Sequence, residues 1–439
     1  MNTTSHRIEV VLWDPHRDAI LVRTGSDAHG QGMHIVGVRD DGFGSAVPAA
    51  VKERFGIEAV LLEPLDIASY VLEAQTDASE APPGGCRWLR ADDATHLGPE
   101  PPGRLSTWLA RRDKPLRPWF APGWYERALA FADQELARLG IRRTGPAHQV
   151  KHWAISSVLR IPTTEGLVYL KTITPEGATE PALLHFLAEW WSHALPEVLA
   201  ASDTDGMVLT ADFGDLDGWK LPELERLDAL TDLAEMQVAL TSDVDTLLDL
   251  GLTRGGPRDL AERIPSLLGR TDLWDAVPNT HDHWHGLTDR QRETWLSLGP
   301  WLTERCMLLA ETDHVVPLSL VHGDFHPGNI ARRGDGFVLH DWTFAEVSHP
   351  FFDLARWLDD TSAKAACAYC AAYLARWPDP RVWSLAKPVA ALYEIDKTVR
   401  MTDTFTSSHA YTLMAVVYGW VRRLLGAVSD PGGTIPNWR

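Results

Sequence analysis

Cysteine is scarce in this chain of 439 residues, and four cysteines are too few and too scattered for a disulfide framework. Cys367 and Cys370 form a single C-x-x-C inside a helical pattern, where a spacing of three residues places both on one face. No second pair of cysteines completes a zinc site. We therefore expect these two side chains to pack in the core rather than to bind metal or carry out redox chemistry.

The chain also lacks an apolar run of about 20 residues, and its first residues carry no basic leader followed by an apolar stretch. We therefore expect a cytoplasmic protein with no membrane partner. Basic residues are in deficit, with 41 Lys and Arg against 60 Asp and Glu and a formal net charge of -19. Nucleic-acid phosphates need clustered Lys and Arg, so no nucleic-acid partner is expected. A cationic small molecule is compatible with this charge, and so is solubility alone.

The length of the chain predicts two or three domains. Residues 1–115 are typical of a small α/β domain, with strand-like segments at 9–13, 19–24, 71–75 and 86–89 and a helical stretch at 46–56. The proline-rich segment 113–123 has no periodicity and is interpreted as the linker. Residues 116–215 then form a helix and short strands, and residues 216–439 are mostly helical. The predicted fold class is α+β, with a small sheet-containing lobe before a large helical lobe.

The segment SLVHGDFHPGNIARRGDGFVLHDW, residues 319–342, carries the strongest chemical signal. Phosphoryl transfer needs a carboxylate to orient and deprotonate the attacking hydroxyl, and it needs oxygen ligands that hold Mg²⁺ on the phosphates. Asp324 and Asn329 share a glycine-containing loop, and Asp341 ends an apolar strand. These two short segments can converge on one metal ion.

The pattern H-G-D-x-H-x-x-N, followed by a strand that ends in D-W, resembles the signature of aminoglycoside phosphotransferases and the related choline, fructosamine and macrolide kinases. The resemblance covers about residues 120–430 and implies a two-lobed fold like that of protein kinases. It implies that Asp324 is the catalytic base, that Asn329 and Asp341 bind Mg²⁺, and that ATP or GTP is the phosphate donor. The implied acceptor is a hydroxyl of a small polar molecule such as an amino sugar or an aminoglycoside. The H-R-D, D-F-G and A-P-E segments of protein kinases are missing, so a protein substrate is not expected.

The resemblance also indicates the residues that hold the nucleotide. Lys171 ends an apolar strand, where kinase-like folds place a phosphate-binding lysine, and Glu180 at the head of a helical run could pair with it. A carboxylate that favours a helix N-terminus explains Glu180 as well. The backbone from Ala211 to Phe213 would meet the adenine edge. Ser156 and Ser157, where a glycine-rich loop would lie, are interpreted as exposed turn residues rather than phosphate contacts.

Further residues near the signature are expected to support it. His322 and His326 are interpreted as scaffold that ties the loop to the neighbouring backbone. Asp353 would brace the loop from a helix start, and helix capping explains it equally well. The histidines of HDHWH, residues 281–285, are interpreted as a surface loop rather than a metal site, because no strand or second shell supports them. Three aspartates lie near a predicted helix start at 240–251, namely Asp243, Asp245 and Asp249. They either attract a cationic acceptor or cap and solvate the helix.

Residues 37–59 and a closing segment at 86–97 resemble a Nudix hydrolase domain, whose glycine-rich loop leads into a helix with metal-binding glutamates. Only Glu53 of the three glutamates is present in the segment 49–57, and Arg54 places a positive charge where a cation would bind. We therefore expect a catalytically silent domain and regard an active Nudix hydrolase as disfavoured. A nucleotide-binding regulatory pseudokinase is the other alternative to an active kinase.

Overall fold

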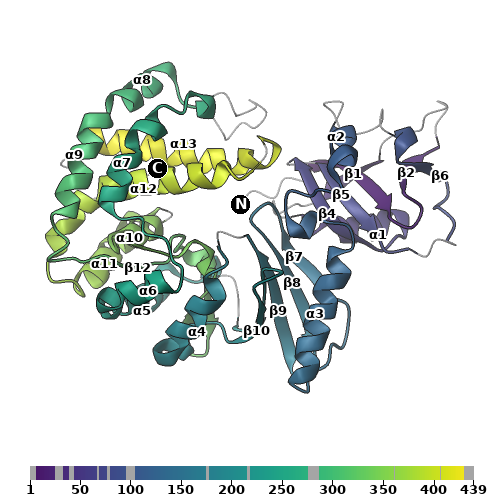
Figure 1. The fold of residues 1–439 in the computed structure, drawn as a ribbon, viewed down its shortest axis with the longest axis horizontal. Coiled ribbons are helices and arrows are strands. Elements are labelled where there is room, and N and C mark those ends of the chain that lie inside the picture. The colour runs from purple at the N-terminus through teal and green to yellow at the C-terminus, as the bar shows by residue number, and fades with distance from the viewer. Residues whose placement is uncertain are drawn as a thin grey trace. The chain divides into compact units, whose positions relative to one another are not determined.

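The computed structural model describes residues 6–24, 33–38, 44–66, 69–76, 80–94, 104–174, 177–214, 218–274, 286–359, 361–405 and 407–429. The chain divides into two compact units, one of Met1–Pro175 with Leu199–Asp212 and the other of Glu176–Val198 with Phe213–Arg439 (Figure 1). The predicted α+β class is confirmed. Within the described part of the chain, no helix is long and apolar enough to cross a membrane.

The first unit begins with a mixed sheet in the order β4-β5-β1-β2-β6, and β3 also pairs with β1. β1 and β5 are parallel, whereas the other pairs are antiparallel. The strands predicted at 9–13, 19–24, 71–75 and 86–89 and the helix predicted at 46–56 are confirmed, whereas β3, β4 and α2 were not predicted. The elements are β1 (His6–Asp14), β2 (Ala19–Arg23), β3 (Met33–Val38), α1 (Val47–Phe55), β4 (Ala59–Asp66), β5 (Ser69–Ala74), β6 (Cys86–Arg90) and α2 (Arg104–Arg111).

Strict alternation along β1 explains why this sheet is covered on both faces. Val10 and Leu12 pack in a cluster with Val51 of α1, whereas Trp13 packs on the other face with Trp108 of α2. Successive side chains of a strand point to opposite faces, so one apolar strand serves both layers. The two helices therefore lie on opposite faces of the sheet.

The first unit continues with a second sheet in the order β10-β11-β9-β8-β7. One face of α3 packs on it, because Ala128, Ala132 and Leu136 recur at helical spacing and join Leu159 and Leu170 of the sheet in one core. The helix and the short strands predicted within residues 116–215 are confirmed. The elements are α3 (Trp124–Arg138), β7 (His148–His152), β8 (Ser156–Thr163), β9 (Gly166–Ile173), β10 (Val198–Ser202) and β11 (Met207–Ala211).

The two sheets of the first unit are joined by buried polar contacts. The side-chain amide of Gln149 accepts from the N–H of Leu61 at 2.7 Å and donates to the carbonyl of Leu61 at 2.8 Å. His152 Nε2 lies 3.0 Å from the carbonyl of Leu62, and its Nδ1 lies 2.9 Å from the hydroxyl of Ser157. A carbonyl can only accept, so Nε2 of His152 carries the proton. These bonds replace strand pairing at the junction of β4 and β7.

Two predictions about the first unit need correction. Ser156 and Ser157 are not exposed turn residues, because β8 buries both of them. The segment 113–123, interpreted as a linker, carries the buried side chains of Trp119 and Phe120. The indole N–H of Trp119 donates to the carbonyl of Trp153 at 2.7 Å, which fixes this segment on the second sheet. The prolines of this segment are visible in the sequence, but the burial of its aromatic side chains is not.

The second unit is mostly helical and has one large apolar core. α12 is its central helix, since every side chain from Val389 to Val399 is buried, and α13 runs beside it (Figure 1). The helices are α4 (Glu180–Trp191), α5 (Leu227–Ala239), α6 (Val244–Asp249), α7 (Pro257–Leu268), α8 (Asp289–Ser297), α9 (Gly299–Ala310), α10 (Phe351–Leu358), α11 (Ala363–Leu374), α12 (Trp383–Thr402) and α13 (Ser407–Ser429). The strands form two short antiparallel pairs, β12 (Ser319–Val321) with β15 (Glu346–Ser348) and β13 (Ile330–Arg333) with β14 (Gly336–Leu339).

The C-x-x-C pair lies on α11, as the helical pattern predicted. Cys370 is half-buried, and burial raises the pKa of its thiol to about 11. Cys367 is exposed, so the prediction of core packing is wrong for this residue. A spacing of three places two residues about 60° apart around a helix, and the edge of the apolar face passes between these two.

Candidate active site

A tight loop after β12 presents Asp324. Gly323 has a φ of +80°, and a Cβ on this residue would lie 2.1 Å from the carbonyl oxygen of Phe344. Only glycine combines that backbone conformation with such a close approach. The loop then enters a short 3₁₀ helix, Pro327–Asn329, and continues into β13. Local sequence therefore sets the turn that carries the carboxylate.

Asp353, in the first turn of α10, holds the loop through its backbone N–H groups. One of its carboxylate oxygens accepts from the N–H of His322 at 2.7 Å and the other accepts from the N–H of Gly323 at 3.0 Å. Gln237 of α5 donates to the same carboxylate at 2.9 Å. Burial raises the pKa of Asp353 to about 7, although the two backbone donors act in the opposite direction. The prediction that Asp353 braces the loop is confirmed.

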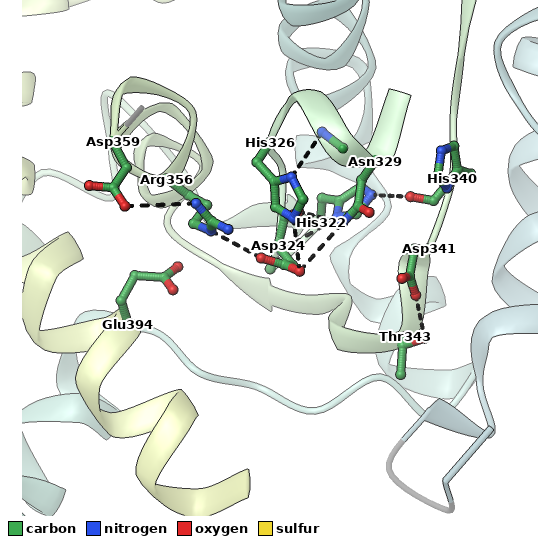
Figure 2. Close-up of polar contacts among 12 residues, drawn as sticks. His322, Asp324, His326, Asn329, His340, Asp341, Thr343, Arg356, Asp359 and Glu394 are labelled. Atoms are coloured by element: carbon green, nitrogen blue, oxygen red, sulfur yellow. Dashed lines mark hydrogen bonds and ion pairs between the residues drawn. The ribbon is translucent and has the colours of Figure 1, made fainter. Parts of the chain in front are cut away.

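The carboxylate of Asp324 is surrounded by donors (Figure 2). Nε of Arg356 lies 3.0 Å from Oδ1, and Oδ2 faces both Nε2 of His326 and the side-chain nitrogen of Asn329 at 3.4 Å. Burial by itself raises the pKa of Asp324, but the neighbouring side chains of His326, Arg356 and Lys397 outweigh it and hold this pKa well below its ordinary value. The carboxylate is therefore ionised across the physiological pH range.

The β13–β14 hairpin brings the two predicted metal ligands to one end. Asn329 and Asp341 flank the paired residues Ile330 and Leu339, and the N–H of His340 donates to the carbonyl of Asn329 at 3.0 Å. The amide nitrogen of Asn329 donates to the backbone carbonyl of Asp324 at 2.8 Å, which directs its oxygen away from that residue. Asparagine and aspartate oxygens are the hard donors that Mg²⁺ prefers, so this donor set fits the ion.

Asp341 has an unusual backbone conformation, with φ at +66°. A non-glycine residue in this left-handed region stores strain, and such strain is common where a side chain must be aimed at a ligand. The hydroxyl of Thr343 lies 2.9 Å from Oδ1 of Asp341 and orients the carboxylate. The turn after β14 therefore fixes the direction of this side chain.

Glu180 is buried at the start of α4 and contacts the turn that follows Asp341. Its carboxylate accepts from the N–H of Trp342 at 3.2 Å and lies 3.1 Å from the hydroxyl of Thr343. The helix-terminus explanation of Glu180 is thus incomplete, because this residue links α4 to the Asp341 turn. Its pairing with Lys171 stays a prediction, since the two residues belong to different units.

The two loop histidines contact the neighbouring backbone as predicted. His322 is fully buried; its Nε2 donates to the carbonyl of His340 at 3.1 Å, and burial lowers its pKa to about 4. Nδ1 of His326 accepts a hydrogen bond from the N–H of Gly328 at 3.0 Å. The ring of Trp219 stacks on the imidazole of His326, with 5.7 Å between the ring centroids. His326 also faces Asp324, and this contact with the site was not predicted.

The residues predicted to bind the nucleotide lie on β9, on β11 and directly after β11. Lys171 lies near the end of β9, between Val158 of β8 and Val208 of β11. Ala211 is the last residue of β11. Phe213 is buried, and its ring packs at 5.1 Å from that of His340, one residue before Asp341. Their contacts with a nucleotide stay predictions.

The sequence contains two further polar clusters. The histidines of 281–285 lie outside the described residues. Among the residues that the structure describes, no group of three His, Cys, Asp or Glu side chains could hold a metal ion. Asp243 is the N-cap residue of α6, although its side chain makes no cap hydrogen bond, and Asp245 lies in the first turn, where the helix dipole favours a carboxylate. These positions leave open the attraction of a cationic acceptor.

The sequence motif did not include Arg356, although the sequence carries a signal for it. Arg356 follows Asp353 by three residues on α10, and this spacing places both side chains on the same face of the helix. It also missed Lys397, which donates to the carbonyl of Gly323 and pairs with Glu394 of α12 at 2.8 Å. Lys397 is 74 residues from Gly323 in the chain, so no local pattern could connect the two residues.

Comparison with known proteins identifies the class of this domain. Residues 192–385 match a family model described as the phosphotransferase enzyme family. The match contains the loop, the hairpin and the start of α10, whereas residues 1–115 lie outside it. No curated protein sequence matches the chain at a significant level. The prediction of a phosphotransferase domain is confirmed.

Several solved structures are similar to the chain. A macrolide 2′-phosphotransferase type I has 15% sequence identity and a TM-score of 0.46, with 66% of this chain and 96% of that chain covered. A choline/ethanolamine kinase family protein from Mesorhizobium loti has 16% identity and a TM-score of 0.43, with 68% and 95% covered. A choline kinase from Cryptosporidium parvum has 9% identity and a TM-score of 0.47, with 70% and 92% covered.

Proposed function

We propose that the chain is a phosphotransferase that moves the γ-phosphate of ATP or GTP to a hydroxyl of a small polar molecule. The observation that carries this proposal is an ionised carboxylate, Asp324, on the same loop as Asn329, which the β13–β14 hairpin joins to Asp341. A base and two oxygen donors on adjoining segments are the parts that phosphoryl transfer needs. The family match at residues 192–385 supports the same reaction class.

In the proposed mechanism, Asp324 accepts a hydrogen bond from the acceptor hydroxyl and aims its oxygen at the phosphorus. A carboxylate with a depressed pKa is a weak base. It therefore takes the proton late, when the forming bond to phosphorus has made the hydroxyl acidic. Asn329 and Asp341 would hold Mg²⁺, which neutralises charge on the phosphates when bound. His322 and Asp353 keep the loop in place during these steps.

Four residues are proposed to take part in nucleotide binding. Lys171 would bind the α- and β-phosphates of the nucleotide. The backbone of Ala211 and Phe213 would meet the base. Glu180 would support the proposed metal-binding turn, because its carboxylate contacts Trp342 and Thr343 directly after Asp341.

For residues 1–115 we propose a Nudix-like domain without hydrolase activity. The mixed sheet and α1 support the likeness, and the side chain of Glu53 on α1 is exposed, next to Arg54. A single glutamate beside an arginine is a poor site for a divalent cation. The full chain should release no product from nucleoside diphosphate derivatives in Mg²⁺ or Mn²⁺, and hydrolysis that Glu53→Gln abolishes would overturn this assignment.

The reaction is tested with Asp324→Asn and Asp341→Ala, assayed for MgATP consumption against amino sugars, aminoglycosides, choline-like alcohols and nucleosides. Asp324→Asn should keep MgATP binding but reduce kcat about 100-fold or more, because the base is lost. Asp341→Ala should weaken binding of the Mg²⁺-nucleotide itself.

Asp379→Asn is the matched control, because this carboxylate lies in the same unit but pairs with the exposed Arg381. This variant should behave like the wild type. Normal turnover by Asp324→Asn, or normal Mg²⁺ dependence of Asp341→Ala, would contradict the assignment of these two residues. A nucleotide-binding pseudokinase would instead bind MgATP and show no turnover with any acceptor of the panel.

A further inference from the structure

Arg356 makes the shortest side-chain contact to the carboxylate of Asp324. Its Nε lies 3.0 Å from Oδ1, whereas the contacts of His326 and Asn329 to Oδ2 are both 3.4 Å. The two carboxylate oxygens are thus held by different groups, which fixes the plane of the carboxylate as well as its position (Figure 2). A charge-assisted hydrogen bond from a guanidinium is the stronger kind of contact.

Arg356 is itself held by a chain of charges. Its NH1 lies 3.9 Å from a carboxylate oxygen of Asp359, the C-cap residue of α10. Asp359 is in turn paired with Arg423 of α13. The side chains of Arg356, Asp359 and Arg423 are 18%, 10% and 19% exposed, so solvent screens these pairs less than pairs at the surface. The planar guanidinium can serve Asp324 and Asp359 together, which a lysine ammonium on its flexible stem cannot do in the same geometry.

We propose that Arg356 is a positioning residue, which aims the Asp324 carboxylate at the acceptor hydroxyl and is aligned from α13 through Asp359 and Arg423. This inference rests on the proposed function, since it assigns a role in that reaction. Arg356 acts through Asp324 and needs no contact with the substrate. It should therefore influence kcat much more than the binding of MgATP.

The test measures MgATP consumption by Arg356→Ala and Arg356→Lys, with the best acceptor of the panel or, without one, with water as the acceptor. Arg356→Ala should lower kcat about 10- to 100-fold, as expected for loss of a hydrogen bond between charged groups. The KM for MgATP should stay within about threefold of the wild-type value. Arg356→Lys keeps the charge and should recover part of the lost kcat.

A double mutant separates positioning from support of the fold. If Arg356 works only through Asp324, Arg356→Ala should cost less than about twofold in kcat when Asp324→Asn is already present. Losses that multiply in the double mutant would overturn the proposal, and so would a wild-type kcat in Arg356→Ala. Normal turnover by Asp324→Asn alone would instead overturn the proposed function.

Two controls account for stability. Arg376→Ala removes an arginine that pairs with Glu235 at 3.3 Å on the surface of the same unit, and it should leave kcat unchanged. Asp359→Asn removes the partner of both arginines without touching Asp324, and it should lower kcat less than Arg356→Ala does. If Arg356→Ala fails to fold, the lysine and Asp359→Asn variants decide. Wild-type kcat values in both of these variants would then reject the role.

Discussion

At the scale of single residues, the site depends on a glycine that no other residue can replace. Gly323 precedes Asp324, has positive φ and lies against the backbone of Phe344, while Asp353 and Lys397 hold its N–H and carbonyl. Gly334, in the β13–β14 turn, also has positive φ, at +60°, but a Cβ there would meet nothing within 4 Å. An alanine at residue 334 would therefore meet backbone strain alone, whereas an alanine at residue 323 would meet both backbone strain and steric overlap.

We expect Gly334→Ala to lower the free energy of unfolding by about 1 kcal/mol, the cost of a left-handed alanine. Gly323→Ala should cost about 3 kcal/mol or more, because the loop must also move away from Phe344. It should reduce kcat as well, since Asp324 moves with the loop. Urea unfolding followed by tryptophan fluorescence measures both variants. Equal losses of stability would show that the loop accommodates a methyl group at residue 323.

At the scale of elements, buried polar residues rather than strand pairing join the two sheets of the first unit. His152 is the centre of this junction, because its ring bonds to β4 and β8 and lies between the rings of Phe120 and Trp124. Burial lowers the pKa of His152 from 6.5 to about 4. The folded protein therefore keeps this ring neutral at a pH at which the unfolded chain protonates it.

This depressed pKa predicts a loss of stability in acid. Below pH 6.5 the unfolded chain binds a proton that the folded chain refuses, so stability falls as the pH drops from about 6.5 to about 4. The loss attributable to His152 is about 3 kcal/mol. His152→Gln cannot titrate, so its deficit relative to the wild type should shrink by that amount over this range.

Urea unfolding at a series of pH values measures this effect. His148→Gln, at an exposed position of the same strand, is the control and should follow the wild-type pH dependence. A deficit of His152→Gln that stays constant from pH 7.5 to pH 4 would show that the ring is not held neutral at the junction.

At the scale of the whole molecule, the charge of -19 bears on the acceptor. We propose an acceptor that carries at least one amine, on the grounds of this charge and of the carboxylates at the start of α6. A cationic acceptor attracted by such carboxylates should lose affinity as salt rises, because the Debye length falls from about 10 Å at 0.1 M to about 3 Å at 1 M. The KM of an amine-bearing acceptor should therefore climb several-fold with salt, while kcat changes little.

The matched measurement uses an uncharged polyol from the same panel, whose KM should not respond to salt. If the best acceptor is uncharged or anionic and its KM is insensitive to salt, the amine is excluded. Helix capping then remains the explanation of Asp243 and Asp245, and the hydroxyl kinase assignment is unaffected.

Patterns of neighbouring residues carried most of what could be predicted. Hydrophobic periodicity predicted the regular strands and helices, and a motif of eight residues indicated the loop with Asp324 and Asn329. β4 was missed because Pro64 and acidic residues interrupt its apolar run, and the sheet tolerates them because β4 is an edge strand. Cys367 was placed in the core because a period of 3.6 residues does not say where an apolar face ends.

The sequence by itself determined the reaction class, since the proposed base, the two proposed oxygen ligands and the turns that carry them all lie within residues 319–342. Only the tertiary structure decided how that base is held. Arg356 of α10 contacts its carboxylate, Lys397 of α12 holds the carbonyl of Gly323, and Arg423 of α13 pairs with Asp359. Glu180 of α4 contacts the turn after Asp341. Such contacts form only when the helices pack around one core, because their spacing in the chain follows no local periodicity.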